Sequence, residues 1–284
     1  MPFVDVRDLR LYYERQGSGP RLLHISGTGG DLRRKPSVFD RPIAQHFDIL
    51  TYDQRGLGQT SKPEADYTMA DYAEDAVALL DAVGWDRCHV MGVSFGGMVA
   101  QEVAIRYPER VDRLVLACTS SGGAGGASYP LHQHLDDTPV ARVERQLGLA
   151  DIRRDAAWRE ANADDYRTLY EQALAGATLG ADEPGRADGY RRQLLARRDH
   201  DTFDRLSSLR MPVFICGGRY DGVAPIANQE ALLREIPGAQ MELFEGGHAF
   251  LQEDPRAFER IIAFLQGKLD DTAAQIEQRA SAAT

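Results

Sequence analysis

Hydrophobic positions along the chain follow two patterns, short apolar runs and longer segments in which apolar residues recur at helical spacing. A continuous apolar run predicts a strand that is buried on both faces of a sheet. Helical spacing predicts amphipathic helices, as in residues 69–84, which end at Gly84, and in residues 95–108. Strands that alternate with helices in this order are typical of a mostly parallel sheet with helices on both faces. The predicted buried strands are residues 21–26, 48–53, 88–94, 111–120, 211–218 and 239–247.

Further strands and helices are predicted before, between and after these buried strands. Two segments near the N-terminus, "FVDV" and "LRLYYERQ", alternate polar and apolar residues and predict a pair of antiparallel strands. Asp40, with Pro42 in the next turn, predicts the start of a short helix over residues 41–47. Two more helices are predicted over residues 226–236 and 254–269, which complete an α/β domain.

One long segment, residues 124–209, contains no strand-like run but several helix-like stretches. We therefore predict a helical cap at 124–209, inserted into a core formed by residues 1–123 and 210–270, with residues 271–284 as a polar tail. The cap segment holds twelve arginines, no lysine and fifteen acidic residues. This balance favours solvated helix faces over an anion site.

Composition excludes several classes of partner. The 284 residues carry a net charge of −10, whereas nucleic acids and anionic membranes require clustered cations. The three cysteines, Cys88, Cys118 and Cys216, lie in or beside apolar runs and are expected to be free core residues. With no signal-like or membrane-length segment, we expect a cytoplasmic protein with a small-molecule partner, and a homo-oligomer remains open.

The segment "GVSFG" (92–96) matches Gly-x-Ser-x-Gly and lies between a predicted strand and a predicted helix. Such a turn is too tight for side chains at positions 92 and 96, and it places Ser94 above the sheet edge at a helix N-terminus. There the helix dipole favours a developing negative charge. The pattern also occurs by chance in glycine-rich loops, but its strand–turn–helix context favours a nucleophilic serine.

A serine hydroxyl needs a base, and the base needs a carboxylate to orient it. Hydrolases with a serine in this kind of turn have the chain order Ser, Asp, His. Asp221 in "GGRYDGVAP" follows a predicted strand, and His248 in "FEGGHAFLQEDP" follows the final predicted strand. We therefore predict a catalytic triad of Ser94, Asp221 and His248.

The glycine-rich segment "SGTGGD" (26–31) follows an apolar run and admits two interpretations. It lacks the Gly-x-x-x-x-Gly-Lys pattern of a phosphate-binding loop. A serine nucleophile instead requires two backbone N–H donors for the tetrahedral oxyanion. We assign these to Phe95 and Thr28, with Gly29 as the alternative to Thr28.

On these motifs the chain resembles the α/β-hydrolase-fold serine hydrolases, over about residues 21–121 and 211–266. "SFGGMVAQ" resembles 3-oxoadipate enol-lactonases and related carboxylesterases, and "GRYDGVAP" is similar to those and to proline iminopeptidases. The resemblance implies an α/β-hydrolase fold with a variable helical cap and chemistry without a cofactor or a metal. The family usually has His-Gly before the oxyanion residue, where this chain has Ser26-Gly27.

Candidates for the substrate pocket follow less directly. They are Gly29, Met98, Tyr129, Trp158, Tyr220 and Phe250, of which we expect at least half of the large side chains to be core residues. Asp53 and Arg55 are expected to tie loops together near the site. "RRK" (33–35) suits a substrate carboxylate, although a solvated loop is favoured. His132 and His134 have a His-x-His spacing, but no further ligand pattern completes a metal site.

We thus expect a serine hydrolase that cleaves a carboxylic ester, lactone or thioester through an acyl-enzyme on Ser94. Hydrolysis of a C–C bond and removal of an N-terminal proline remain alternatives on the same fold. A ligand-binding protein of this fold without catalysis is the alternative from another class.

Overall fold

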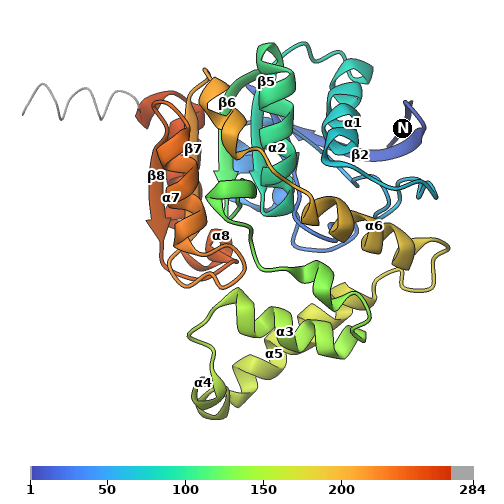
Figure 1. Cartoon of the computed structure of the whole chain (residues 1–284), viewed down its shortest axis with the longest axis vertical. Helices are drawn as coiled ribbons and strands as arrows, with labels where there is room; N and C mark the ends of the chain where they lie inside the picture. Colours follow the sequence, from blue (N-terminus) through green and yellow to red (C-terminus); the bar gives the residue numbers. More distant parts are fainter. Residues whose placement is uncertain (1, 270–284) are drawn as a thin grey trace, which may run out of the picture.

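The computed structural model describes residues 2–269, and within this range eight strands form one sheet in the order β1-β2-β4-β3-β5-β6-β7-β8 (Figure 1). The pairs β1/β2 and β2/β4 are antiparallel, and the pairs from β4/β3 to β7/β8 are parallel. This is the mostly parallel sheet that the apolar runs predict. The strands are β1 (Phe3–Val6), β2 (Leu9–Gly17), β3 (Arg21–Ile25), β4 (Asp48–Tyr52), β5 (Cys88–Val93), β6 (Val111–Ala117), β7 (Val213–Gly218) and β8 (Gln240–Phe244).

Both faces of the sheet are buried because successive side chains of each strand point to opposite sides. In β3, Leu22 belongs to one hydrophobic cluster and Leu23 to the other, and both are fully buried. Ile49 and Leu50 divide in the same way in β4. Apolar residues at consecutive positions are therefore required, which explains the continuous runs in the sequence.

Helices cover the two faces separately. Helices α1 (Met69–Ala82), α2 (Phe95–Arg106) and α7 (Ile226–Glu235) contribute to the first cluster. Helices α8 (Phe250–Glu253) and α9 (Arg256–Leu265) contribute to the second. Thr68 caps α1 in a capping box with Asp71, which fixes where that helix begins.

The predicted helix over residues 41–47 is replaced by two short 3₁₀ helices, Val38–Asp40 and Pro42–Gln45. Asp40 does not cap the second one. Its carboxylate instead accepts the backbone N–H of Ser37 and completes a capping box for the first. Asp40 thus stabilises the helix Val38–Asp40 and not the one that begins at Pro42. Each of the two helices is too short to continue as an α-helix.

The segment predicted as a cap contains the helices α3 (Pro139–Ala150), α4 (Ala156–Ala161), α5 (Ala163–Thr178) and α6 (Arg186–Arg198), of which α3, α4 and α5 lie below the core in Figure 1. Its two ends meet where Gly122 pairs with Asp201 and the Thr202 N–H donates to the Ser121 carbonyl. Residues 203–209 follow this crossing, and Leu206 and Leu209 are buried in the first core cluster. They therefore pack with the core, although the sequence assigns them to the cap. The predicted tail, residues 271–284, lies outside the described residues.

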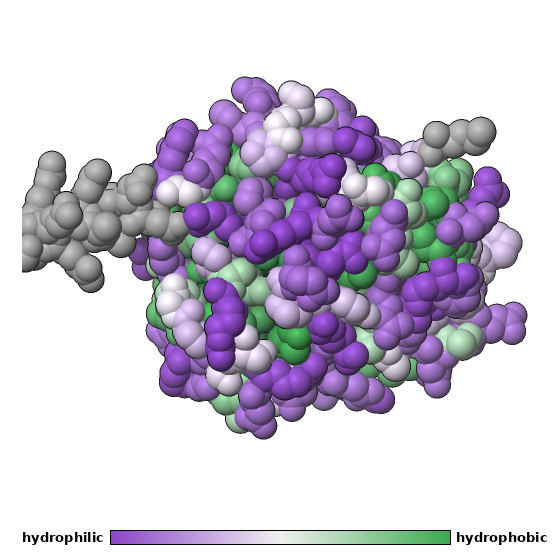
Figure 2. All heavy atoms as spheres, turned by 90° about the horizontal axis from the view of Figure 1, so that it is seen from above, coloured by the Kyte–Doolittle hydropathy of each residue, from purple (hydrophilic) through white to green (hydrophobic). Residues whose placement is uncertain are grey.

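The surface seen in Figure 2 is mostly hydrophilic, with apolar residues in separate patches. Within residues 2–269, no helix combines the length and the hydropathy that crossing a bilayer requires.

Candidate active site

Ser94 lies in the turn between β5 and α2, at the carboxyl end of the parallel strands. Its backbone has φ of 55° and ψ of −118°, a conformation that non-glycine residues rarely adopt. A Cβ at Gly96 would overlap the carbonyl oxygen of Ile25, and one at Gly92 would overlap that of Gly96. The turn is held by hydrogen bonds from the Ser94 N–H to the Ala117 carbonyl and from Thr119 Oγ1 to the Ser94 carbonyl, both 2.8 Å. The two glycines of the motif are therefore a steric requirement.

Ser94, His248 and Asp221 form a continuous hydrogen-bonded series. His248 Nε2 lies 3.0 Å from Ser94 Oγ, and His248 Nδ1 lies 2.7 Å from Asp221 Oδ2. The three residues come from segments that follow β5, β8 and β7, which end at the same edge of the sheet. The structure thus brings together the three side chains that the sequence predicts.

Asp221 and His248 are each fixed by backbone hydrogen bonds. Asp221 is buried, and its Oδ1 accepts the N–H groups of Val223 at 2.7 Å and Ala224 at 2.9 Å. The other oxygen, Oδ2, is left for His248. The His248 N–H donates to the carbonyl of Ala150, the last residue of α3, so the predicted cap contacts the backbone of the histidine directly.

The loop at residues 26–31 lies against Ser94, since a Cβ at Gly27 would be 3.4 Å from the Ser94 Cβ. Among the described residues, no acceptor is bonded to the amides of Thr28 and Phe95. The Gly29 amide is different, because it donates to Gln193 Oε1 at 2.8 Å. Of the two candidates in this loop, Thr28 therefore has the free donor.

Two buried side chains, Gln54 and Asp53, fix this loop and the residue that follows it. Gln54 donates from Nε2 to the Ser26 carbonyl at 2.7 Å and to Ser26 Oγ at 3.3 Å, which identifies the partner of the serine at the usual histidine position. Asp53 accepts the Leu32 N–H at 2.7 Å and the Gln59 N–H at 2.8 Å. Burial raises the pKa of Asp53 to about 6. As predicted, Asp53 ties loops together. Arg55 ties its loop to Asp8, between β1 and β2, and to Asp75 of helix α1.

A cavity of about 210 Å³ opens above Ser94 and His248. Its walls come from the loop with Thr28 and from the predicted cap, which contributes Leu131 and Leu149 as apolar lining. Asp137 and Arg145 also line it, and they form an ion pair at 2.8 Å. The cavity therefore has an apolar wall, a neutralised ion pair and one further guanidinium, that of Arg142.

The residues predicted for the substrate pocket lie elsewhere. Phe250 is fully buried and stacks on Phe244 in the second core cluster, and Met98 is buried against the first. Tyr220 lies under the guanidinium of Arg153 at 3.9 Å. Trp158 is on α4, 5.7 Å from the guanidinium of Arg154, and neither aromatic residue lines the cavity above Ser94.

Tyr129 and Gly29 lie next to the cavity without lining it. The Tyr129 ring stacks on His134, and its hydroxyl lies 3.1 Å from His134 Nε2, so His134 lines the cavity in its place. Gly29 lines a neighbouring cavity under the cap helices. None of the five large side chains predicted for the pocket lines the cavity above Ser94, which corrects the prediction. Met98 and Phe250 pack in the core clusters, and the rings of the other three pack on neighbouring side chains.

The cysteines fit the prediction of free core residues. All three are buried and free, and burial raises the pKa of Cys118 well above its ordinary value. Cys118 lies close to Asp221 and His248, and among residues 2–269 these are the three groups with a spacing that suits a metal ion. Both ring nitrogens of His248 are already hydrogen-bonded, so the cluster fits a metal poorly.

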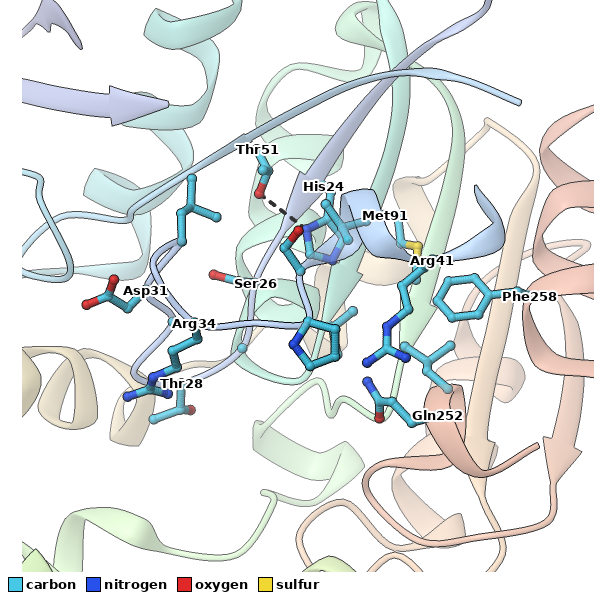
Figure 3. Close-up of a pocket in the computed structure, with 18 of the residues that line it drawn as sticks. His24, Ser26, Thr28, Asp31, Arg34, Arg41, Thr51, Met91, Gln252 and Phe258 are labelled. Atoms are coloured by element: carbon cyan, nitrogen blue, oxygen red, sulfur yellow. Dashed lines mark hydrogen bonds between the residues drawn. The ribbon is translucent and has the colours of Figure 1, made fainter. Parts of the chain in front are cut away.

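A second cavity, of about 430 Å³, adjoins the first on the other side of the loop with Gly27 and Thr28 (Figure 3). Arg34 and Arg41 lie on opposite sides of this hollow, and His24 lies deep in it with Nδ1 3.3 Å from Thr51 Oγ1. The loop at residues 26–31 therefore has a cavity on each side of it.

Sequence reasoning missed two positioning glutamines and one arginine of the cavity. Gln54 follows β4 at the edge of the sheet where Ser94 lies, and a polar residue at that position could have been recognised from the sequence. Arg142 and Gln193 lie on α3 and α6 of the predicted cap. The sequence of such a helix does not indicate which neighbouring element a single polar side chain contacts.

Comparisons with known proteins agree with this fold. A sequence model described as the alpha/beta hydrolase fold matches residues 20–255. The chain is 30% identical over 283 residues to an uncharacterized protein of Mycobacterium tuberculosis, covering 92% of this chain and 80% of that protein. It is 26% identical over 267 residues to 3-oxoadipate enol-lactonase 2 of Acinetobacter baylyi, covering 91% and 94%. The crystal structure of the enol-lactonase from Burkholderia xenovorans superposes with a TM-score of 0.72 at 22% identity, covering 95% of this chain and 98% of that one.

Proposed function

This chain belongs to the α/β-hydrolase fold family, and on that basis we propose that it is a serine hydrolase that cleaves a carboxylic ester, lactone or thioester of a small molecule. The observation that carries the proposal is the series of hydrogen bonds from Asp221 through His248 to Ser94. A serine held in this way has both a base for its proton and a group that orients the base. The similarity to proteins named as enol-lactonases supports a hydrolytic reaction.

In the first half of the proposed reaction, His248 Nε2 accepts the proton of Ser94 Oγ as the oxygen attacks the substrate carbonyl. Asp221 accepts the hydrogen bond from Nδ1–H and stabilises the imidazolium that forms. The amides of Thr28 and Phe95 donate to the tetrahedral oxyanion. The imidazolium then gives its proton to the leaving alcohol, thiol or enol, which leaves an acyl group on Ser94.

In the second half, a water molecule takes the place of the leaving group. His248 accepts a proton from this water as it attacks the acyl carbonyl, and the same two amides hold the second oxyanion. Collapse releases the acid and returns the proton to Ser94. Neither half requires a metal or an organic cofactor.

An aminopeptidase-type reaction has less support in the cavity. Recognition of an α-amino group requires a free carboxylate, and Asp137 is the acidic residue among the described residues that line the cavity. Its charge is already matched by Arg145. We therefore rank hydrolysis of an ester or lactone above removal of an N-terminal proline.

Hydrolysis by the Ser94→Ala variant tests the proposal. We expect the wild type to hydrolyse p-nitrophenyl butyrate, and Ser94→Ala to lose this activity while its melting temperature is retained. Asp221→Asn should lower kcat by on the order of 10³-fold or more, because the histidine loses its orienting acceptor. If the wild type instead prefers Pro-p-nitroanilide or a vinylogous diketone to the esters and an enol-lactone, the bond that it cleaves is an amide or a C–C bond. Activity that survives in Ser94→Ala would contradict the proposal.

A further inference from the structure

A third cavity, of about 390 Å³, lies between the loop with Thr28 and helices α3, α5 and α6. Four arginines line it, namely Arg34, Arg142, Arg186 and Arg191, and none of the described residues that line it is acidic. Their concentration contrasts with the net charge of −10 of the whole chain. The balanced composition of the predicted cap therefore conceals a local excess of positive charge.

This cavity adjoins the one that contains Ser94. The two share Thr28, Arg142, Gln146 and Tyr190 as lining residues. Thr28 belongs to the loop whose amide faces the proposed oxyanion, and Arg142 lies on α3 between the two spaces. The arginine-lined cavity is therefore the space next to a carbonyl held at Ser94, on the side of Gln146 and Arg142.

The charges of three of the four arginines are not matched by a carboxylate among the described residues, and of these Arg191 is exposed whereas Arg34 and Arg142 are partly buried. Arg186 is paired with Asp31 at 3.4 Å, and Asp31 is also bonded to Arg33. For Arg34 and Arg142, no carboxylate within the described residues lies at ion-pair distance. Arg142 lies over the ring of Tyr190 at 4.6 Å and donates from Nη2 to the Asp137 carbonyl at 3.4 Å, which leaves its other N–H groups available.

Arg34 is the more unusual of the two. Its Nε is buried without a hydrogen-bond acceptor, packed against Gly176 of α5. Figure 3 shows the side chain on the Thr28 side of the second cavity, so it lies where the second and third cavities meet. Burying an unpaired guanidinium costs free energy, and a bound anion offsets that cost.

We propose that the substrate carries a free carboxylate remote from its scissile carbonyl, and that Arg34 and Arg142 bind this carboxylate. The inference rests on the proposed hydrolase function and specifies its substrate class as acidic half-esters, acidic lactones or the corresponding thioesters. A guanidinium presents a planar pair of N–H donors that matches the two oxygens of a carboxylate, and charge-assisted bonds of this kind are stronger than neutral ones. The carboxylate positions the substrate, and Ser94 reacts with the carbonyl at its other end.

A matched pair of chromogenic esters tests this subsite. Mono-p-nitrophenyl adipate has a free carboxylate at the far end of its acyl chain, and p-nitrophenyl hexanoate has a methyl group there. We expect kcat/KM of the wild type to be at least about tenfold higher for the adipate ester, the effect of one charge-assisted interaction. Arg34→Gln and Arg142→Gln should each reduce this ratio by about tenfold, and Arg34→Lys should restore part of it.

Arg167→Gln is the matched control. Arg167 is an exposed arginine of α5 that pairs with Asp164 and does not line the cavity, so its loss should leave the ratio unchanged. Equal kcat/KM values for the two esters, or a ratio that Arg34→Gln and Arg142→Gln leave unchanged, would overturn the subsite while the hydrolase proposal stands.

Binding to the Ser94→Ala variant separates the two proposals. By calorimetry, this variant should bind monomethyl adipate more tightly than methyl hexanoate, and adding Arg34→Gln should remove the difference. If Ser94→Ala still hydrolyses esters, the catalytic proposal fails, but this binding difference still decides whether the carboxylate site exists. Equal binding of the two methyl esters would overturn it.

Discussion

Gln193 on α6 accepts a hydrogen bond from the backbone N–H of Gly29 at 2.8 Å. The two residues are far apart in the sequence, and the bond connects a helix of the predicted cap to the loop proposed to hold the oxyanion. Gln193 is fully buried, so water cannot replace it. Helix α6 therefore positions a part of the proposed active site.

Gln193→Met should reduce both stability and turnover. The substitution keeps the side-chain volume but leaves the buried Gly29 N–H without an acceptor, which should cost about 1–3 kcal/mol of unfolding free energy. Turnover should fall by about tenfold with little change in KM for a neutral ester, because a misplaced oxyanion donor acts in the transition state. Urea unfolding and ester kinetics measure the two effects. Gln133→Met, at an exposed glutamine, is the control, and an unchanged kcat in Gln193→Met would show that the bond does not position the loop.

Gln54 and Ser26 should differ in their importance. Gln54→Leu removes the donor to the Ser26 carbonyl, whereas Ser26→Ala removes only the longer bond to the hydroxyl. We expect Gln54→Leu to cost about 1–3 kcal/mol of unfolding free energy, and Ser26→Ala to cost about 1 kcal/mol or less. Chemical denaturation compares the two. A larger loss in Ser26→Ala would mean that the hydroxyl holds the loop.

The turn around Ser94 gives a prediction about sterics. In Gly96→Ala, the new Cβ overlaps the Ile25 carbonyl, and we expect a loss of about 3 kcal/mol or more together with loss of esterase activity. Gly84→Ala is the comparison, because Gly84 has φ of 71° but open space around it. It should cost only about 1–2 kcal/mol of backbone strain and leave the activity unchanged. Similar thermal stability for the two variants would contradict the steric explanation.

Sequence patterns predicted the sheet because its signal is local. Leu22 and Leu23 point to opposite faces, and the requirement that both be apolar is visible in two adjacent letters. The role of Ser94 could be predicted in the same way. The glycines two residues before and after it are required by backbone contacts within the same turn and with β3, so they form a local motif.

The substrate cavity could not be predicted in this way. Tyr220 and Trp158 suggest a pocket by composition, but their rings lie against Arg153 and Arg154, and the cavity is lined by Arg142 and other residues of the predicted cap. Which face of a cap helix meets the sheet depends on contacts between elements, such as Gln193 with Gly29, that no local pattern encodes.

A buried histidine should make the protein sensitive to acid. His200 is buried, its Nε2 lies 3.2 Å from the Ser120 carbonyl, and burial lowers its pKa to about 4. The pKa in the unfolded chain is about 6.5, so as the pH falls the unfolded chain binds the proton first. The contribution to stability is complete above pH 6.5 and is lost progressively between about pH 6.5 and 4.

His200→Gln tests this sensitivity. The amide can still donate to Ser120 but does not titrate, so the loss of unfolding free energy between pH 7 and pH 4 should be smaller in the variant, by up to about 3 kcal/mol. Urea unfolding of both proteins at the two pH values measures the difference. The same decrease in both proteins would place the acid sensitivity in other groups.

The most direct test of the account is covalent labelling by a fluorophosphonate, which reacts with serines that are activated by a hydrogen-bonded base. We predict one phosphonyl adduct per chain, located by peptide mass spectrometry on Ser94, and its loss in both Ser94→Ala and His248→Ala. An adduct on another residue, or labelling that persists in Ser94→Ala, would contradict the assignment of Ser94 as the nucleophile.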